Sequence, residues 1–475
     1  MKLFRRTLSA DCNTPVALFA CLRGEHECFL FESAEGGEHW GRYSILGFDP
    51  ATVAVEKAGR LYLRHREQPN EVQDTDMLSW LRENVIQHDV MQGAEGLPFA
   101  GGAVGYFAYD MIHRFEDGLK TDIPDATLAA YMIVDRFVIM DSLHGVIHLC
   151  VLDQDKASAQ TLLDNMEIAI SRAHSPEAMR LDVDCSTAQV PQGHMSQADY
   201  EAMVLKAKAY ILAGDIFQVV LSQRFSAALN CDPLTIYRAL RHINPSPYLF
   251  YLHVDETILI GSSPEILVKK ERNKGMVRPI AGTRPRGKTS EQDLALEQEL
   301  LADSKEIAEH VMLVDLGRND LGRVCEYGSV KVSESMCIER YSHVMHIVSQ
   351  VEGALRSDVD ALDLLAATFP AGTLSGAPKI RAMQIIQEQE AECRGPYGGC
   401  IGHISFGGED MDTTIIIRTA VIQNETVFVQ AGAGIVADSD PSKEHQECIN
   451  KATAIFRALA LAESQTPLKQ QDKAS

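Results

Sequence analysis

The N-terminal third of the chain alternates between short apolar runs and polar turns, a pattern typical of β-strands. Residues 28–31 and 137–140 are β-type runs bounded by glycine, aspartate or serine. Residues 101–107 form a glycine-punctuated run without the spacing or the following helix of a dinucleotide-binding loop, so it predicts a strand packed closely against a neighbour. A helical stretch is predicted at 156–173, and the polar segment 181–195 predicts a linker.

Helical periodicity becomes clear at Ser196, which together with Asp199 resembles a capping box. Apolar residues then recur at helical spacing, and Gly214 is a natural stop for this helix. The last predicted helix has Asp440 as its cap and Pro441 in its first turn. The other elements predicted in this region are the strands 216–223, 248–253, 257–260, 414–418 and 427–430 and the helices 304–313, 360–368, 379–390 and 441–463.

The order of these elements lacks the regular strand–helix alternation of a parallel sheet. It therefore predicts an α+β fold with mainly antiparallel sheets. We expect an N-terminal domain over 1–180, a second domain over 196–463 and a polar, mobile tail over 464–475. With 475 residues and 45% hydrophobic content, the chain is long enough to bury a large core.

Composition narrows the classes of partner. The chain has 44 basic and 66 acidic residues, a formal net charge of −22, which disfavours nucleic acids and anionic membranes. An anionic substrate would therefore need locally supplied positive charge. The 11 cysteines include no C-x-x-C pair, and no apolar run reaches the ~18 residues of a membrane span. We expect free thiols in a protein that is neither exported nor membrane-bound, which predicts a cytoplasmic location.

Two predicted helices carry clustered carboxylates. Glu306, Glu309 and Leu313 share one face of the first helix, and Glu447 lies one turn before Lys451 on the last. One interpretation is a pair of solvated acidic faces with ordinary surface ion pairs. The other is a bound cation, because two carboxylates beside a leucine are costly to bury without one. Spacing alone leaves both open.

The stretch 279–284, Pro-Ile-Ala-Gly-Thr-Arg, resembles the signature of the chorismate-utilising enzyme family. Members that make aminodeoxychorismate carry a lysine where this chain has Ala281, and members that activate water carry one where it has Gln218. The resemblance thus implies the ammonia-using, aromatising branch, which forms anthranilate and pyruvate from chorismate. It covers nearly all of 196–462 and implies two antiparallel sheets flanked by helices, with the chorismate site in the second domain.

The resemblance also implies roles for individual residues. Glu265 matches a general acid that protonates the departing C4 hydroxyl, and His346 matches a histidine of the later elimination. Arg418 matches a substrate-carboxylate ligand, and the Gly-Ala-Gly run that starts at Gly432 is read as a turn presenting backbone N–H groups. The implied sets are the catalytic Glu265, His346, Gln218 and Thr373; the chorismate-binding Gly282, Thr283, Tyr397, Arg418, Gly432, Ala433, Gly434 and Lys451; and Glu309 and Glu447, with Glu306 as a secondary partner, for Mg²⁺.

A second pair of motifs, 30–33 and 244–249, resembles the feedback-inhibitor site of biosynthetic members, which binds L-tryptophan. In this chain Phe31 replaces a usual leucine and Leu249 replaces a usual methionine. Both exchanges are between apolar residues, so they change the affinity of the site without removing it. An ordinary strand end and turn is the alternative interpretation. The implied inhibitor residues, with an N-terminal domain contributing part of the site, are Glu32, Ser33, Pro247, Tyr248 and Leu249.

The chain has no Gly-x-Cys-x-Gly elbow of a glutamine amidotransferase. Ammonia is therefore expected from a separate amidotransferase subunit, in a heterotetramer of two of each subunit that catalyses the first step of tryptophan biosynthesis. Two alternatives remain: an aminodeoxychorismate-forming enzyme, which Ala281 disfavours, and a non-catalytic chorismate- or tryptophan-binding partner of an amidotransferase. The sequence leaves tryptophan and secondary aromatic pathways undistinguished.

Overall fold

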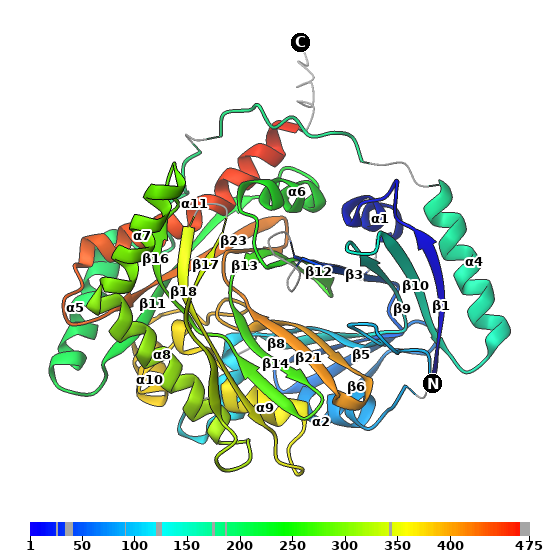
Figure 1. The fold of residues 1–475 in the computed structure, drawn as a ribbon, viewed down its shortest axis with the longest axis horizontal. Coiled ribbons are helices and arrows are strands. Elements are labelled where there is room, and N and C mark those ends of the chain that lie inside the picture. The colour runs from blue at the N-terminus through cyan, green and yellow to red at the C-terminus, as the bar shows by residue number, and fades with distance from the viewer. Residues whose placement is uncertain are drawn as a thin grey trace.

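The computed structural model (Figure 1) describes residues 1–24, 27–33, 41–90, 92–119, 126–172, 176–185, 188–341 and 344–465. Most of the predicted tail, residues 466–475, lies outside the described residues, while residues 464 and 465 belong to the last helix. Among the described helices, none combines the length and the apolar composition needed to cross a membrane. All the cysteines are unpaired, as predicted.

The described residues form strands throughout the chain and helices between them. The strands are β1 Lys2–Ser9, β2 Cys28–Glu32, β3 Tyr43–Phe48, β4 Thr52–Lys57, β5 Arg60–His65, β6 Glu71–Gln73, β7 Gly102–Phe107, β8 Thr127–Val134, β9 Arg136–Asp141, β10 Val146–Asp153, β11 Gln218–Ala228, β12 Tyr248–Val254, β13 Thr257–Ser263, β14 Ile266–Glu271, β15 Lys274–Val277, β16 Ile280–Pro285, β17 Lys331–Arg340, β18 Val344–Ala354, β19 Gly376–Ala377, β20 Cys400–Ser405, β21 Asp410–Ile415, β22 Thr419–Gln423 and β23 Thr426–Ile435. The α-helices are α1 Pro15–Leu22, α2 Met77–Leu81, α3 Ile112–Phe115, α4 Lys156–Arg172, α5 Gln197–Leu212, α6 Pro233–Ile243, α7 Ser290–Ala302, α8 Ser304–Gly322, α9 Ala361–Thr368, α10 Lys379–Gln389 and α11 Pro441–Gln465. The shorter helical turns are η1 Arg82–Ile86, η2 Tyr109–Met111, η3 Asp117–Leu119, η4 Gly372–Leu374 and η5 Phe406–Gly408.

Two large sheets, built from antiparallel pairs, make up the centre of the described structure. The first has the order β1-β10-β9-β3-β2-β12-β13-β22-β23-β11-β19. The second has the order β16-β18-β15-β14-β21-β20-β7-β8-β4-β5-β6, with β17 paired to β18. Strands from the N-terminal third join strands from the rest of the chain in both sheets, through the pairs β2–β12 and β7–β20. The α+β class with antiparallel sheets flanked by helices is therefore confirmed.

Alternating side chains divide the core into layers. On β2, Phe29 packs into the core between the sheets, while Leu30 packs into a second core. On β12, Phe250 and Tyr251 make the same division, as the period of two in a strand requires. Helices α6 and α11 cover the second core on the outer face of the first sheet (Figure 1). Both faces of this sheet are therefore buried over much of its area.

Local capping explains where the helices begin. The side chain of Ser196 accepts a hydrogen bond from the backbone N–H of Asp199, as predicted for α5. Asp360 caps α9 in a full capping box with Asp363. Helix α8 continues to Gly322, well past the predicted residue 313. The carboxylates Glu306 and Glu309 therefore lie on a much longer helix than the periodicity indicated.

Two predictions about strand ends are wrong. The strand predicted at 414–418 ends at Ile415, and Arg418 adopts a left-handed backbone with φ of 50° between β21 and β22. The Gly-Ala-Gly run predicted as a turn lies inside β23, because its ladder with β11 continues through Gly434 opposite Val220. The glycines therefore allow close packing within a sheet and do not reverse the chain.

Candidate active site

Glu265 lies between β13 and β14, where its side chain is 9% exposed. The hydroxyl of Thr373, on η4, donates a 3.0 Å hydrogen bond to the carboxylate. Burial raises the pKa of Glu265 to about 8, against the opposing effects of that hydrogen bond and of the charges on Arg418 and Lys451. A carboxyl group that stays protonated near neutral pH can act as a general acid.

His346 faces the same region from β18. Its Nδ1 lies 3.1 Å from the carbonyl oxygen of Gly282 and 3.0 Å from the hydroxyl of Thr283. Because a carbonyl oxygen only accepts, Nδ1 carries the proton of the neutral ring, which leaves Nε2 as a proton acceptor. Burial lowers the pKa of His346, so the ring is neutral at physiological pH. Gly282, with φ of 72°, occupies a bulge in β16 that brings its carbonyl to this histidine.

The predicted metal-binding carboxylates converge from two helices. Burial raises the pKa of Glu309, and the negative charges of Glu306 on α8 and Glu447 on α11 raise it further. Among the described residues, no three histidine, cysteine or acidic side chains form a ready-made metal cluster. The donor set nevertheless fits Mg²⁺, which takes one or two protein carboxylates and fills its octahedron with water and substrate oxygens. A cation between these carboxylates would also relieve their mutual repulsion.

Gln218 and Lys451 join the carboxylates to the wall formed by β11 and β23. The amide of Gln218 donates to Glu309 at 3.3 Å, and a Cβ atom at Gly434 would lie only 2.7 Å from the same amide nitrogen. The ammonium group of Lys451 lies 2.8 Å from Glu447 and donates to the carbonyl oxygen of Gly432 at 2.9 Å. Gly432 and Gly434 therefore need to be small because Tyr397 and Gln218 lie directly against them, whereas the side chain of Ala433 packs in the second core on the other face of β23.

Arg394 was not predicted, although it organises the back of the site. Its guanidinium donates to both carboxylate oxygens of Glu390, and the carbonyl oxygens of Val220 and Leu374 accept from it at 2.8 and 2.7 Å. Its charged carbon lies 5.7 Å from the ring centroid of the predicted substrate residue Tyr397. One buried cation thus fixes β11, the turn next to Thr373 and Tyr397 relative to one another.

The predicted catalytic, chorismate and metal residues therefore gather in one region, although they come from segments far apart in the chain. The charge of Arg418 acts on both Glu265 and His346. Glu309 in turn interacts with the charges of Glu306 and Glu447. Glu306 bridges to the signature strand, since its carboxylate lies 3.3 Å from the position a Cβ atom would take at Gly282. Their chemical roles remain predictions.

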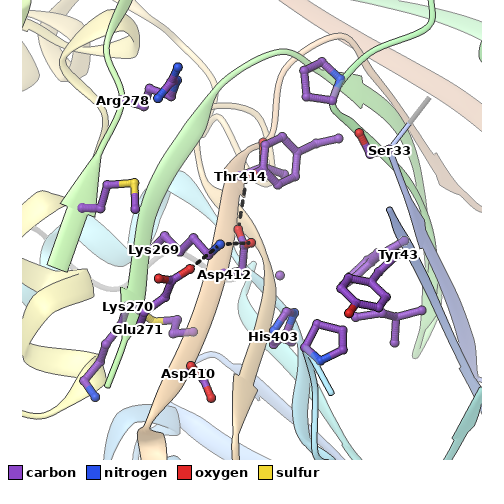
Figure 2. Close-up of a pocket in the computed structure, with 18 of the residues that line it drawn as sticks. Ser33, Tyr43, Lys269, Lys270, Glu271, Arg278, His403, Asp410, Asp412 and Thr414 are labelled. Carbon is purple, nitrogen blue, oxygen red and sulfur yellow. Dashed lines mark hydrogen bonds and ion pairs between the residues drawn. The ribbon is translucent and has the colours of Figure 1, made fainter. Parts of the chain in front are cut away.

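The predicted inhibitor residues line a different cavity, of about 1150 Å³, between the two sheets (Figure 2). Ser33 and Tyr248 reach it from the first sheet, together with Pro247 and Leu249. Glu32 also borders the cavity, but its carboxylate contacts Tyr237 and Arg241 of α6. Sequence reasoning missed the wall formed by the second sheet, which contributes His403, Asp412 and Thr414.

Comparisons with known proteins agree with this architecture. The family model of the chorismate binding enzymes matches residues 26–457. Component 1 of anthranilate synthase from Acinetobacter calcoaceticus is 46% identical over 97% of this chain and 95% of its own length, and that from Pseudomonas aeruginosa is 47% identical over 96% and 94%. The solved structure of anthranilate synthase component I from Streptococcus pneumoniae TIGR4 superposes with a TM-score of 0.78 at 37% identity, covering 94% of this chain and 99% of that one. The chain therefore belongs to the family of chorismate binding enzymes.

Proposed function

We propose that this chorismate-utilising enzyme is the synthase component of an anthranilate synthase. It combines chorismate with ammonia and releases anthranilate, pyruvate and water. The observation that carries this proposal is the buried carboxyl of Glu265, with its pKa raised to about 8, set among the cationic Arg418 and Lys451. The names of the relatives at 46% and 47% identity support the same reaction.

The charged side chains of the site would orient the substrate. Chorismate carries two carboxylates, and Arg418 suits bidentate recognition of one of them. Glu309 and Glu447, with Glu306 nearby, would hold Mg²⁺, which would bind and neutralise the other carboxylate. Tyr397, Gly432 and Gly434 form a close-fitting wall beside them.

The chemistry then proceeds in two stages. Glu265 donates its proton to the C4 hydroxyl, which leaves as water while ammonia forms a bond to C2. In the second stage Nε2 of His346 takes the C2 proton as the C3–O bond breaks, and the released enolpyruvate becomes pyruvate. The neutral Gln218 and Ala281 cannot activate water or form a covalent bond to the ring, which leaves ammonia as the nucleophile.

The direct test is product analysis of the purified chain with chorismate, Mg²⁺ and ammonium at alkaline pH. Fluorescence and mass detection should find anthranilate and pyruvate in equal amounts, and a chelator should abolish both. Aminodeoxychorismate without pyruvate would support the alternative branch. No turnover with intact chorismate binding would instead support a non-catalytic partner.

We expect the rate of the chemical step to fall on the alkaline side with a midpoint near pH 8. Glu265 must be protonated to act, and its raised pKa of about 8 keeps it protonated below that value and ionised above it. The measurement is kcat against pH at a constant concentration of free ammonia, since total ammonium would otherwise change its nucleophilic fraction. A kcat that stays constant up to pH 10 would contradict this role.

Metal dependence should weaken when either carboxylate is neutralised. Glu309→Gln and Glu447→Gln are each expected to raise the Mg²⁺ concentration for half-maximal activity at least about tenfold, because Mg²⁺ prefers charged oxygen ligands. Glu291→Gln, on the exposed face of α7, is the matched control and should leave the titration unchanged. A Mg²⁺ titration of kcat checks this, and an unchanged midpoint in both site variants would refute the assignment.

We also propose that the cavity between the sheets binds L-tryptophan as a feedback inhibitor. Its support is that Ser33, Pro247, Tyr248 and Leu249, with the acidic Glu32 at its edge, border one cavity. Ammonia would come from a separate glutamine amidotransferase, in keeping with the component 1 names of the relatives. The two proteins would form a heterotetramer of two of each subunit. This assembly would catalyse the first step of tryptophan biosynthesis. Mass photometry of the co-expressed subunits tests the stoichiometry.

A further inference from the structure

Lys379 is a buried lysine at the first position of α10, where a cation is unfavourable for the helix. Its side chain is 7% exposed. The N-terminus of a helix carries a positive partial charge, which repels an ammonium group. The preceding residue, Pro378, provides no side-chain cap for the helix. Helix formation therefore does not account for a lysine here, and the explanation lies in its tertiary contacts.

The ammonium group of Lys379 connects three helices. It donates to Oδ2 of Asp320, near the end of α8, at 2.8 Å and to the carbonyl oxygen of Thr368, the last residue of α9, at 3.2 Å. Burial raises the pKa of Asp320, and the charge of Lys379 opposes that effect. A buried ion pair gives little net stability compared with apolar side chains of similar volume. Its directed hydrogen bonds instead fix the positions of α8, α9 and α10 relative to one another.

These contacts close a loop that reaches the proposed active site. Residues 369–378 follow Thr368 directly and lead into α10 at Lys379, so one ammonium group bridges both ends of the loop. The loop includes η4, on which the hydroxyl of Thr373 donates to the carboxylate of Glu265 at 3.0 Å. The hydrogen-bond partner of the proposed general acid therefore lies on a loop whose ends are held by a single side chain.

The loop lies against α8, with a small cavity beside the contact. A Cβ atom at Gly372 would lie only 2.1 Å from Cδ2 of Leu316, so η4 packs closely on the helix. Asp320, Glu265 and Thr373 border a cavity of about 40 Å³ at this place. Such a volume is large enough for a water molecule. Release of the loop ends would let η4 shift into this space and move Thr373 away from Glu265.

We propose that the pair Lys379–Asp320 positions Thr373 for the proposed reaction, by fixing the ends of the loop that carries it. The inference rests on the proposed function, in which Glu265 is the general acid. The hydrogen bond from Thr373 stabilises the ionised form of Glu265 and so lowers its pKa, against the larger effect of burial. Loss of the positioning should therefore raise the pH at which Glu265 loses its proton.

The pH dependence of kcat, measured on the full chain at a constant concentration of free ammonia, tests the proposal. Thr373→Val removes the hydrogen bond and should raise the alkaline midpoint by about one pH unit. Lys379→Met combined with Asp320→Asn should raise it by about half a unit or more. In the Thr373→Val background the same pair of substitutions should add no further shift, because a pair that acts through Thr373 then has no hydrogen bond to hold.

Two other variants complete the design. Lys331→Met combined with Glu352→Gln removes a lysine–carboxylate pair between β17 and β18 and is the matched control, which should keep the wild-type midpoint. Asp320→Asn alone keeps the volume of the side chain and the lysine itself. It should also raise the midpoint, and it decides the question if the variant that lacks Lys379 does not fold.

Three results would overturn the positioning role. A wild-type midpoint in the folded variants would do so even if kcat fell, because a purely structural role lowers activity without moving the midpoint. A shift that adds to that of Thr373→Val would mean that the pair acts by another route. If wild type makes no anthranilate, the proposed function itself fails. Infrared titration of the Glu265 carboxyl group, assigned by its absence in Glu265→Gln, then tests the pair independently, and an unchanged titration would exclude it.

Discussion

Replacing Glu265 by glutamine is expected to lower kcat for anthranilate formation by roughly 10²- to 10⁴-fold. Glutamine has almost the same volume and can keep the hydrogen bond from Thr373, so the site should stay intact. The amide cannot release a proton to the C4 hydroxyl, which must then leave as hydroxide. Steady-state kinetics should therefore show a large loss in kcat with little change in the KM for chorismate.

Two further measurements isolate the proton transfer in this prediction. Glu352→Gln is a matched control, because Glu352 is also buried but pairs with Lys274 and Lys331, away from the site. It should leave kcat within about threefold of wild type, since it touches no reacting group. A Glu265→Gln variant with near wild-type kcat would exclude the general-acid role, whatever its KM.

Replacing Arg394 by methionine is expected to reduce the free energy of unfolding by about 3–5 kcal/mol. The arginine side chain is 1% exposed and its partner Glu390 is 7% exposed, so the substitution leaves a buried carboxylate without its counter-charge. Val220 and Leu374 lose the donors to their carbonyl oxygens at the same time. The measurement is chemical denaturation, analysed with the same dependence of the unfolding free energy on denaturant concentration for wild type and variant.

Two further variants serve as controls for Arg394→Met: a substitution in an exposed ion pair and a double substitution. Arg318→Met removes an exposed partner of Asp315 and should cost at most about 1 kcal/mol. Arg394→Met combined with Glu390→Gln should recover part of the lost stability, because glutamine removes the uncompensated charge and can still accept from Ser222. If Arg394→Met alone were as mild as Arg318→Met, the buried cation would not hold the site together.

The fold was predictable from the sequence where periodicity is local. Helix α5 and its Ser196 cap, and strands such as β12, follow from patterns within a few residues. The end of β21 was not predictable in this way. The apolar run through Ile417 continues past the strand, and only the left-handed conformation of Arg418 reveals that the chain has turned.

The candidate site could be predicted only in part, for a similar reason. The carboxylates of α8 and α11 show helical spacing, but their convergence depends on packing that no local pattern encodes. The role of Arg394 could not be predicted from local patterns, because its partners Val220 and Leu374 are distant in the sequence. The pair of His403 and Asp412 lies across a single hairpin, and recognising β20 and β21 as neighbours would have placed the two side chains together.

The interleaving of the sheets limits how the proposed inhibition could be lost. Because β2 pairs with β12 and β7 pairs with β20, removing the N-terminal third would leave two strands with unpaired edges in the catalytic half. Such a truncation would expose aggregation-prone surface together with the inter-sheet core. Insensitivity to the proposed inhibitor should therefore arise by single substitutions within the cavity, whereas deletion of the N-terminal third should prevent folding.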